Sequence, residues 1–167
     1  MWRVIRIIGR DGLASAPPPA DLAAQEVQRL GRELQAIMGR ALAIRHVDAG
    51  SCNGCELEIH ALNNPLYNLE GAGIRFVASP RHADLLLVTG PVTLHMEEAL
   101  RRTYEAMPEP RLVLATGDCG CDGGIFADSY AVRGGVAAVL PVDALLPGCP
   151  PTPLELLRAI LALARPL

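Results

Sequence analysis

The stretch ADLLLVTG, residues 83–90, is a short apolar run that ends at a glycine. A run of this length is typical of a strand buried on both faces, because most helices are longer. More short apolar runs lie before and after it along the chain. They are ALAIRHV (41–47), GIRFVAS (73–79), RLVLATG (111–117) and VAAVLPV (136–142). We predict that each of these runs is a strand.

Segments with helical periodicity alternate with these runs. They span 94–107 and 152–164, and Pro153 suits the first turn of the second segment. Buried strands that alternate with helices are typical of a parallel sheet covered by helices on both faces. The sequence therefore predicts a flavodoxin-like α/β domain over about residues 41–167.

Residues 1–40 differ from the rest of the chain. Residues 11–20, DGLASAPPPA, have the proline and alanine content of a linker. The next segment, 21–39, places apolar residues at helical spacing, with Asp21 suited to its N-cap and Gly39 to its C-terminal stop. We predict an N-terminal extension that consists of a linker and one helix.

Composition argues against several classes of function. The formal net charge of −3 over 167 residues gives no sign of nucleic-acid binding. No apolar run reaches the roughly 18 residues of a membrane span, and the arginine-rich N-terminus does not resemble a secretory signal. We therefore expect a cytoplasmic chain, in which cysteines at motif spacing more often bind metal or carry out redox chemistry than form disulfides.

Cysteines follow three of the predicted strands. Cys52 and Cys55 come after the first strand, Cys119 and Cys121 after the fourth, and Cys149 after the fifth. The loops at the carboxyl ends of the strands in such a sheet gather on one edge and form the site. Glycines crowd around these cysteines, which indicates a small, tightly wrapped pocket. We therefore expect a single cysteine site at this edge.

The chemistry of this site has three interpretations. Four thiolates bind an iron–sulfur cluster, and a proline beside a ligand cysteine, as in Cys149-Pro150, recurs in such sites. Four thiolates also bind a structural zinc, although zinc sites usually combine two CxxC-like pairs. A redox dithiol of Cys52 and Cys55 requires a thioredoxin-like fold and leaves the other cysteines unexplained. The spacing favours the cluster and leaves the other two interpretations open.

Four motifs, in the same order along the chain, resemble a known family. They are GSCNGCELEI (50–59), SPRHADLLLVTGPVT (79–93), ATGDCGCDGGIF (115–126) and LPVDALLPGCPPTPLELL (140–157). Together they resemble the small subunit of energy-converting, membrane-bound nickel–iron hydrogenases, a group that includes the formate hydrogenlyase small subunit. They also resemble the homologous 20-kDa subunit of NADH-quinone oxidoreductase, or complex I.

The resemblance implies one 4Fe–4S cluster, the one closest to the large partner subunit. Carried over residue by residue, its ligands are Cys52, Cys55, Cys119 and Cys149. Cys121 then becomes an extra thiol. Complex I subunits typically have two adjacent cysteines at the first position, whereas hydrogenase small subunits have CxxC. The CxxC of this chain therefore places it on the hydrogenase side of the family.

Two carboxylates next to the CxxC motif are candidate proton relays. In the family, an acidic residue near the position of Glu56 and Glu58 lies at the interface with the large subunit, where protons enter or leave. A carboxylate near a metal centre can relay protons, and Glu58 would share one side of a short helix with Cys55. The alternative is that each glutamate is solvated or structurally paired.

The resemblance also implies a role for the loop that contains Arg81 and His82. In the family this loop approaches the cluster, so a cation here would stabilise the reduced state. The alternative is an ion pair between Arg81 and Asp84 that anchors the loop. The remaining histidines have no ligand spacing and are interpreted as structural: His46, His60 and His95.

The resemblance predicts an electron-transfer subunit of an oxidoreductase, with no turnover from the chain alone. Electrons pass from a ferredoxin-like iron–sulfur subunit through the cluster to the nickel–iron centre of a hydrogenase large subunit. Membrane-arm subunits hold the assembly peripherally on the inner, cytoplasmic face of the cell membrane. Two alternatives stay open: a complex I type subunit that passes electrons to quinone, and a zinc-stabilised interaction module without redox function.

Overall fold

The computed structural model describes residues 39–65 and 67–164 as two long segments. Before them it describes residues 25, 28, 29, 31–33 and 36, all of which are helical and fall in the segment predicted as a helix. Asp21 and the predicted linker lie outside the described residues. Gly39 has a φ of +61°, a left-handed conformation that is common where helices end. The division of the chain at residue 40 stays a prediction.

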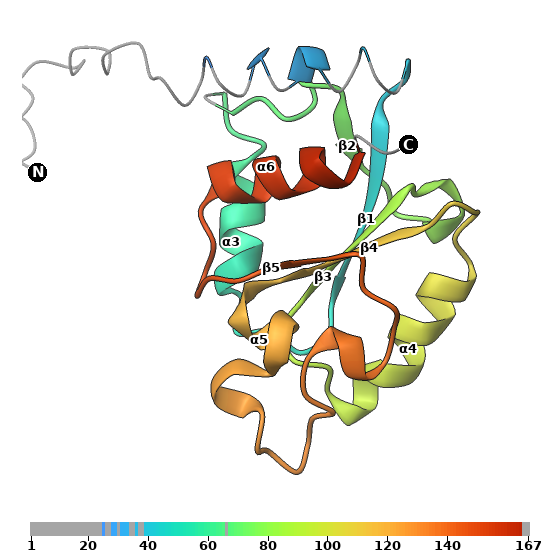
Figure 1. Ribbon diagram of the computed structural model, residues 1–167, viewed down its shortest axis with the longest axis vertical. Helices are drawn as coiled ribbons and strands as arrows, with labels where there is room; N and C mark the ends of the chain where they lie inside the picture. Colours follow the sequence, from blue (N-terminus) through green and yellow to red (C-terminus); the bar gives the residue numbers. More distant parts are fainter. Residues whose placement is uncertain are drawn as a thin grey trace, which may run out of the picture.

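The described residues form a five-stranded, all-parallel sheet in the order β2-β1-β3-β4-β5 (Figure 1). The strands are β1 Leu42–Asp48, β2 Ile74–Phe76, β3 Leu85–Thr89, β4 Leu112–Thr116 and β5 Ala144–Leu146. This is the strand order of flavodoxin-like folds. The predicted fold class is therefore confirmed.

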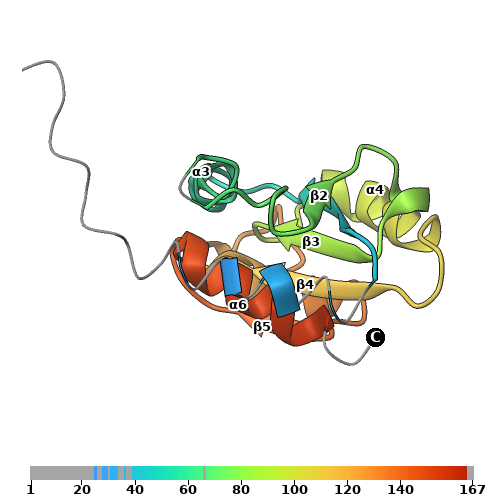
Figure 2. The same cartoon turned by 90° about the horizontal axis from the view of Figure 1, so that it is seen from above.

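Helices cover both faces of the sheet (Figure 2). They are α3 Gly54–Ala61, α4 Leu94–Glu105, α5 Gly117–Asp122 and α6 Pro153–Ala164. Ile59 of α3 and Leu156 of α6 pack on one face, and Leu100 of α4 packs on the other. The helix predicted over 152–164 indeed begins at Pro153. Among the described residues, no helix has both the length and the apolar character that crossing a membrane requires.

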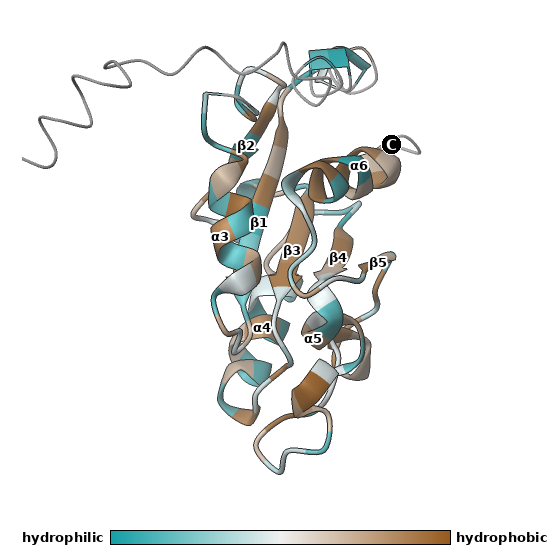
Figure 3. Ribbon diagram, turned by 90° about the vertical axis from the view of Figure 1, so that its left-hand side faces the viewer, coloured by the Kyte–Doolittle hydropathy of each residue, from teal (hydrophilic) through white to brown (hydrophobic). Residues whose placement is uncertain are grey.

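The run ADLLLVTG forms the central strand β3, which is buried on both faces. Leu85 and Leu87 pack with α3 and α6, whereas Leu86 and Val88 pack on the α4 side. Successive side chains of a strand point to opposite faces, so a strand covered on both sides must be apolar throughout. Figure 3 shows β3 and β4 as apolar strands in the interior of the domain.

The strand predicted over residues 136–142 is wrong. Val136–Ala138 forms a 3₁₀ turn, η3, and the last strand of the sheet is β5, further along the chain. Val136, Val139 and Leu140 are buried together on the α4 side of the sheet. Their i, i+3, i+4 spacing is helical and does not alternate as a half-buried strand would. The run therefore supplies core residues without joining the sheet.

Candidate functional site

Four of the five cysteines line one cavity at the carboxyl edge of the sheet. Cys52 lies just before α3, Cys55 in α3, Cys119 in α5, and Cys149 in the loop after β5. The cavity that they line, hereafter the cysteine cavity, has a volume of about 130 Å³. The other residues that line it are Ser51, Gly54, Gly90, Gly117, Asp118, Gly148 and Pro150. The sheet thus brings together cysteines that are up to 97 positions apart (149 − 52).

Glycines make room for the thiols at two places. A Cβ atom on Gly117 would lie 2.7 Å from the Cys55 Sγ, and one on Gly124 would lie 3.1 Å from the Cys119 Sγ. Gly117 also has a φ of +82°, a left-handed conformation that favours glycine. A side chain at Gly117 would therefore displace the Cys55 thiol, and one at Gly124 would press on Cys119, so both glycines help to place the thiols.

Two aspartates hold the loops that carry the cysteines. The Asp48 Oδ1 accepts hydrogen bonds of 2.7 Å from the amides of Gly50 and Ser51, just before Cys52. The Asp118 Oδ1 accepts one of 2.7 Å from the amide of Gly148, and the Gly148 carbonyl accepts one of 2.9 Å from the Asp118 amide. The sequence analysis missed both aspartates, although an aspartate two residues before a glycine is a known turn signal.

Two thiols of the cysteine cavity, those of Cys55 and Cys119, resist ionisation. Burial raises the pKa of Cys55 to about 12, and the neighbouring Glu56 and the other three cavity cysteines act in the same direction. Burial likewise raises the pKa of Cys119, with further contributions from Cys149 and Cys52. Thiolates in such a place require a cationic partner, because metal ligands must be deprotonated.

Cys121 lies apart from this group. It is half-buried in α5, its Sγ is 4.0 Å from the Ala115 carbonyl oxygen, and it does not line the cysteine cavity. Burial raises its pKa as well. The structure therefore brings together four thiols and separates the fifth.

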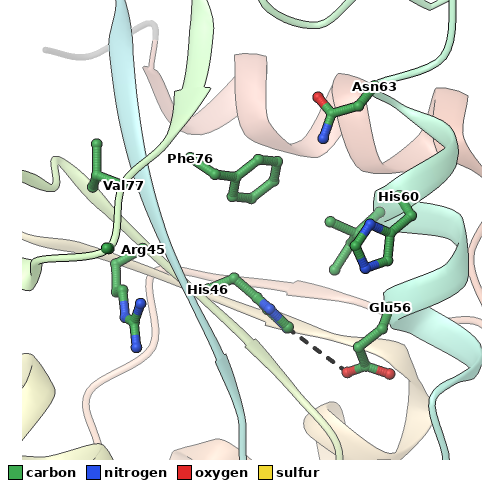
Figure 4. A pocket seen from close by; sticks show the side chains of 9 residues that line it. Arg45, His46, Glu56, His60, Asn63, Phe76 and Val77 are labelled. Atoms are coloured by element: carbon green, nitrogen blue, oxygen red, sulfur yellow. Dashed lines mark ion pairs between the residues drawn. The ribbon is translucent and has the colours of Figure 1, made fainter.

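Glu56 is the only charged residue of α3 that is buried, with 7 % of its surface exposed. Its Oε2 accepts a 2.6 Å hydrogen bond from the Ser51 hydroxyl, and its Oε1 has no hydrogen-bond partner. The Oε1 lies 3.7 Å from the His46 Nε2, as Figure 4 shows. Glu58 is half-buried and does not line the cysteine cavity. The two candidate relay residues therefore have different surroundings.

A second cavity, hereafter the His46 cavity, lies between β1, β2 and α3 (Figure 4). Its volume is about 350 Å³. It is lined by Arg45, His46, Glu56, Ile59, His60, Asn63, Phe76, Val77 and Ala78. Burial lowers the pKa of His46, although the nearby carboxylates of Glu56 and Asp48 oppose this effect. The sequence analysis treated His46 as structural, yet Arg45 and His46 within an otherwise largely apolar strand were a usable signal.

The loop with Arg81 and His82 is not where the resemblance suggested. The two residues are exposed in a 3₁₀ turn, η1 Pro80–His82, which precedes β3. It therefore lies at the amino edge of the sheet, opposite the cysteines. The proposed ion pair with Asp84 is also wrong, since Asp84 pairs with Arg40 through bonds of 2.8 and 2.6 Å. Neither residue belongs to the cysteine site.

The fold and the site together define a flavodoxin-like domain with a four-cysteine cavity at the carboxyl edge of its sheet. The family model described as "NADH ubiquinone oxidoreductase, 20 Kd subunit" matches residues 52–163. Because this match covers more than half of the chain, the protein belongs to this family of oxidoreductase subunits. The resemblance that the motifs indicated is confirmed.

Two relatives and one solved structure are similar over most of the chain. The chain is 49 % identical to formate hydrogenlyase subunit 7 of Escherichia coli over 114 residues, which are 68 % of this chain and 45 % of the relative. It is 43 % identical over 128 residues to a probable membrane-bound hydrogenase subunit of Pyrococcus furiosus, 77 % of each chain. The chain therefore spans less than half of the length of the formate hydrogenlyase subunit.

The solved structure is that of the membrane-bound sulfane sulfur reductase, an archaeal respiratory membrane complex. One of its chains matches with a TM-score of 0.66 and 32 % sequence identity. The match covers 81 % of this chain and 76 % of that chain. These similarities extend the family relationship to the three-dimensional fold.

Proposed function

We propose that this protein is an electron-transfer subunit that holds one 4Fe–4S cluster in the cysteine cavity. The observation that carries the proposal is that four separated thiols line a single cavity. Iron–sulfur clusters are usually held by four cysteine thiolates, and the four here are Cys52, Cys55, Cys119 and Cys149. When bound, such a cluster accepts and releases single electrons.

The chain's own residues supply the thiolates, the shape and the surroundings of this site. Because its pKa is raised to about 12, the Cys55 thiol is expected to lose its proton when a bound metal compensates the charge, as the iron of a cluster would. Gly117 and Gly124 leave the space beside the sulfurs that a side chain would fill. The largely apolar lining of the cysteine cavity gives a bound group few polar contacts, and such surroundings affect its potential.

The donor arrangement supports a single zinc ion less well. Zinc requires four ligands about 2.0–2.3 Å from one point. In the described part of the chain, no group of three or more His, Cys, Asp or Glu residues is placed to hold a metal ion. A cluster needs its four ligands spread around a cavity, as the thiols are here.

The relatives support a hydrogenase-type complex, since two of them are a formate hydrogenlyase subunit and a probable membrane-bound hydrogenase subunit. In this proposal, electrons arrive from a ferredoxin-like iron–sulfur subunit, cross this chain and reach the nickel–iron centre of a large subunit. Membrane-arm subunits hold the assembly on the inner face of the cell membrane. The chain alone has no turnover, because the nickel ligands belong to the large subunit.

A second candidate is a complex I type subunit that passes electrons to quinone. The description of the matching family favours it. The CxxC spacing of Cys52 and Cys55 favours the hydrogenase type instead, since complex I subunits typically have adjacent cysteines at this position. The nature of the large partner subunit distinguishes the two candidates.

Glu56 is the better placed of the two candidate proton relays. It follows Cys55 directly, it is buried, and its carboxylate accepts the Ser51 hydroxyl next to Cys52. One of its oxygens is free to accept a further proton donor. We assign the relay to Glu56 first and keep Glu58, which faces neither cavity, as the second choice.

The test is EPR spectroscopy and metal analysis on the complex purified without oxygen. The proposal predicts a reduced-state 4Fe–4S signal that is assigned to this chain, together with nickel in the large subunit. A cluster signal without nickel would favour the quinone-reducing type. One zinc per chain and no iron in it would contradict the proposal and leave the domain a structural module.

A further inference from the structure

One charged residue is found among those that line the cysteine cavity. It is Asp118, and the other described residues that line this cavity are cysteines, glycines, a serine and a proline. Asp118 is half-buried and directly precedes Cys119 on α5. Within the described part of the chain, the lining of the cysteine cavity therefore combines four thiols with one carboxylate and includes no basic side chain.

Two hydrogen bonds fix the position of Asp118. Its Oδ1 accepts a 2.7 Å bond from the Gly148 amide, and its own amide donates a 2.9 Å bond to the Gly148 carbonyl. Gly148 also lines the cysteine cavity and directly precedes Cys149. The carboxylate is thus held where the segments that carry Cys119 and Cys149 meet.

The charge of Asp118 is not offset by a cation of this chain. Among the residues that the structure describes, no arginine or histidine forms an ion pair with it. Burial raises the pKa of Cys119 and of Cys121 most, and the charge of Asp118 acts in the same direction on both thiols. The carboxylate therefore disfavours additional negative charge on the neighbouring sulfur atoms.

Glu56 is a second carboxylate near a thiol of this cavity, but its surroundings differ. Like burial, it acts to raise the pKa of Cys55. However, Glu56 lines the His46 cavity, together with three basic residues: Arg45, His46 and His60. Basic side chains can thus offset the charge of Glu56, whereas none of the described residues that line the cysteine cavity can do so for Asp118.

A cluster in the cysteine cavity gains one negative charge when it is reduced. A fixed negative charge nearby disfavours the more negative state, just as it disfavours the ionisation of a neighbouring acid. Charges also interact more strongly in apolar surroundings than in water, and the lining of the cysteine cavity is largely apolar. A carboxylate at this position therefore opposes the reduction of the cluster.

We propose that the Asp118 carboxylate lowers the potential of the cluster and thereby suits its electrons to the reduction of protons rather than of quinone. This inference rests on the proposed function, because it requires the cluster. The cluster takes one electron at a time from the donor iron–sulfur subunit, and two such electrons with two protons form one molecule of hydrogen at the large subunit. A cluster of lower potential is the stronger reductant, and protons are harder to reduce than quinone.

The experiment is an EPR-monitored redox titration of the intact complex at one fixed pH. Asp118→Asn keeps an oxygen that can accept the Gly148 amide but removes the charge. We expect the equilibrium constant for reduction of the cluster to rise about tenfold, at the lower end of what one nearby charge does to an ionisation, which raises the potential by about 59 mV. Asp118→Glu keeps the charge and should leave the potential close to that of the parent.

Asp122→Asn is the matched control, because it removes the same charge from the same helix. Asp122 is exposed, does not line the cysteine cavity, and accepts a 2.8 Å hydrogen bond from the Gly124 amide. This variant should shift the potential much less than Asp118→Asn does. Asp118→Ser is a second neutral variant that should also raise the potential, and it tests the inference where Asp118→Asn assembles poorly.

The outcomes separate this inference from the proposed function. An unchanged potential in both neutral variants of Asp118, or an equal rise in Asp122→Asn, would overturn the role of Asp118 while the cluster signal leaves the proposed function standing. An equal rise in Asp118→Glu would make shape rather than charge responsible and would overturn it too. Loss of the cluster from both neutral variants would mean that Asp118 holds the cluster instead of setting its potential, which also contradicts the inference. Absence of any 4Fe–4S signal in the parent overturns both.

Discussion

The cysteine cavity and the His46 cavity lie next to each other but are built from different chemistry. The cysteine cavity is small, largely apolar and walled by glycines. The His46 cavity is larger and is lined by an arginine, two histidines and a glutamate. Consecutive residues of α3, Cys55 and Glu56, belong to the two different cavities. The comparison teaches that two consecutive residues of one helix can line cavities of different chemical character.

The largest effect should come from Glu56→Gln, which removes the carboxylate but keeps the shape. We expect proton-dependent turnover of the complex to fall by about 100-fold, the typical share of one acid–base group, while the cluster signal stays. Hydrogen evolution and EPR on the same sample measure the two quantities. Glu58→Gln is the matched control and should lower turnover much less. An equal loss of turnover in both variants would refute the assignment of the relay to Glu56 rather than Glu58.

The cysteine cavity should be broken by Gly117→Ala. Its added Cβ would lie 2.7 Å from the Cys55 Sγ. We therefore expect the free energy of unfolding to fall by about 1–3 kcal/mol more than in the control variant, as at other overpacked sites, and the iron content to fall as well. Gly134→Ala is the control, because it has a similar φ of +99° but no atom within 4 Å of the added Cβ. Chemical denaturation and iron analysis check the prediction. Equal effects of the two variants would mean that the backbone conformation matters and the thiol does not.

A smaller effect is expected from Asp118→Ala, which unties the loops that carry Cys119 and Cys149. The lost hydrogen bond from the Gly148 amide to a carboxylate should cost about 1.5 kcal/mol of unfolding free energy. Cluster lifetime under oxygen should shorten as well, because the two ligands are no longer held together. An unchanged unfolding curve would show that the loop is held by other contacts.

The smallest effect should come from Asp84→Ala, at the amino edge, because Asp84 lines neither cavity. Burial of Asp84 acts to raise its pKa, but the bonds from Arg40 and from the Ala43 amide outweigh this and lower it. The folded state therefore gains stability above the ordinary pKa of about 3.9, and the gain is lost as pH falls through the lower, folded value. Because Arg40 is largely exposed, we expect only about 0.5–1 kcal/mol at pH 7. Denaturation at pH 7 and at pH 2.5 should show a larger difference at pH 7 than at pH 2.5, and the cluster potential should not move.

Much of the fold could be predicted because its signals are local. The run ADLLLVTG is buried on both faces and so is apolar throughout, and Pro153 begins α6 as its fixed φ allows. The run VAAVLPV misled because Val136, Val139 and Leu140 are buried in a turn rather than in a strand. Hydrophobic content alone does not distinguish these two ways of filling a core.

The cysteine cavity was predictable because its cysteines come in short motifs at the ends of strands. The His46 cavity was not, since His46 and Glu56 lie ten positions apart on different elements and meet only in the folded chain. The position of Arg81 was predicted wrongly because its loop comes directly before β3. In a parallel sheet, a segment that leads into a strand lies at the amino edge, whereas a segment that leaves a strand lies at the carboxyl edge. Spatial neighbours of this kind require the topology, and the motifs do not contain it.

The central claim is that four cysteines, and not the fifth, hold the cluster. The most direct measurement is the EPR spectrum of the reduced complex with Cys119→Ser and with Cys121→Ser. These positions are two residues apart in α5, but only the first lines the cysteine cavity. The account predicts that Cys119→Ser loses or alters the 4Fe–4S signal and that Cys121→Ser keeps it. The reverse result, or loss of the signal in both, would contradict the assignment.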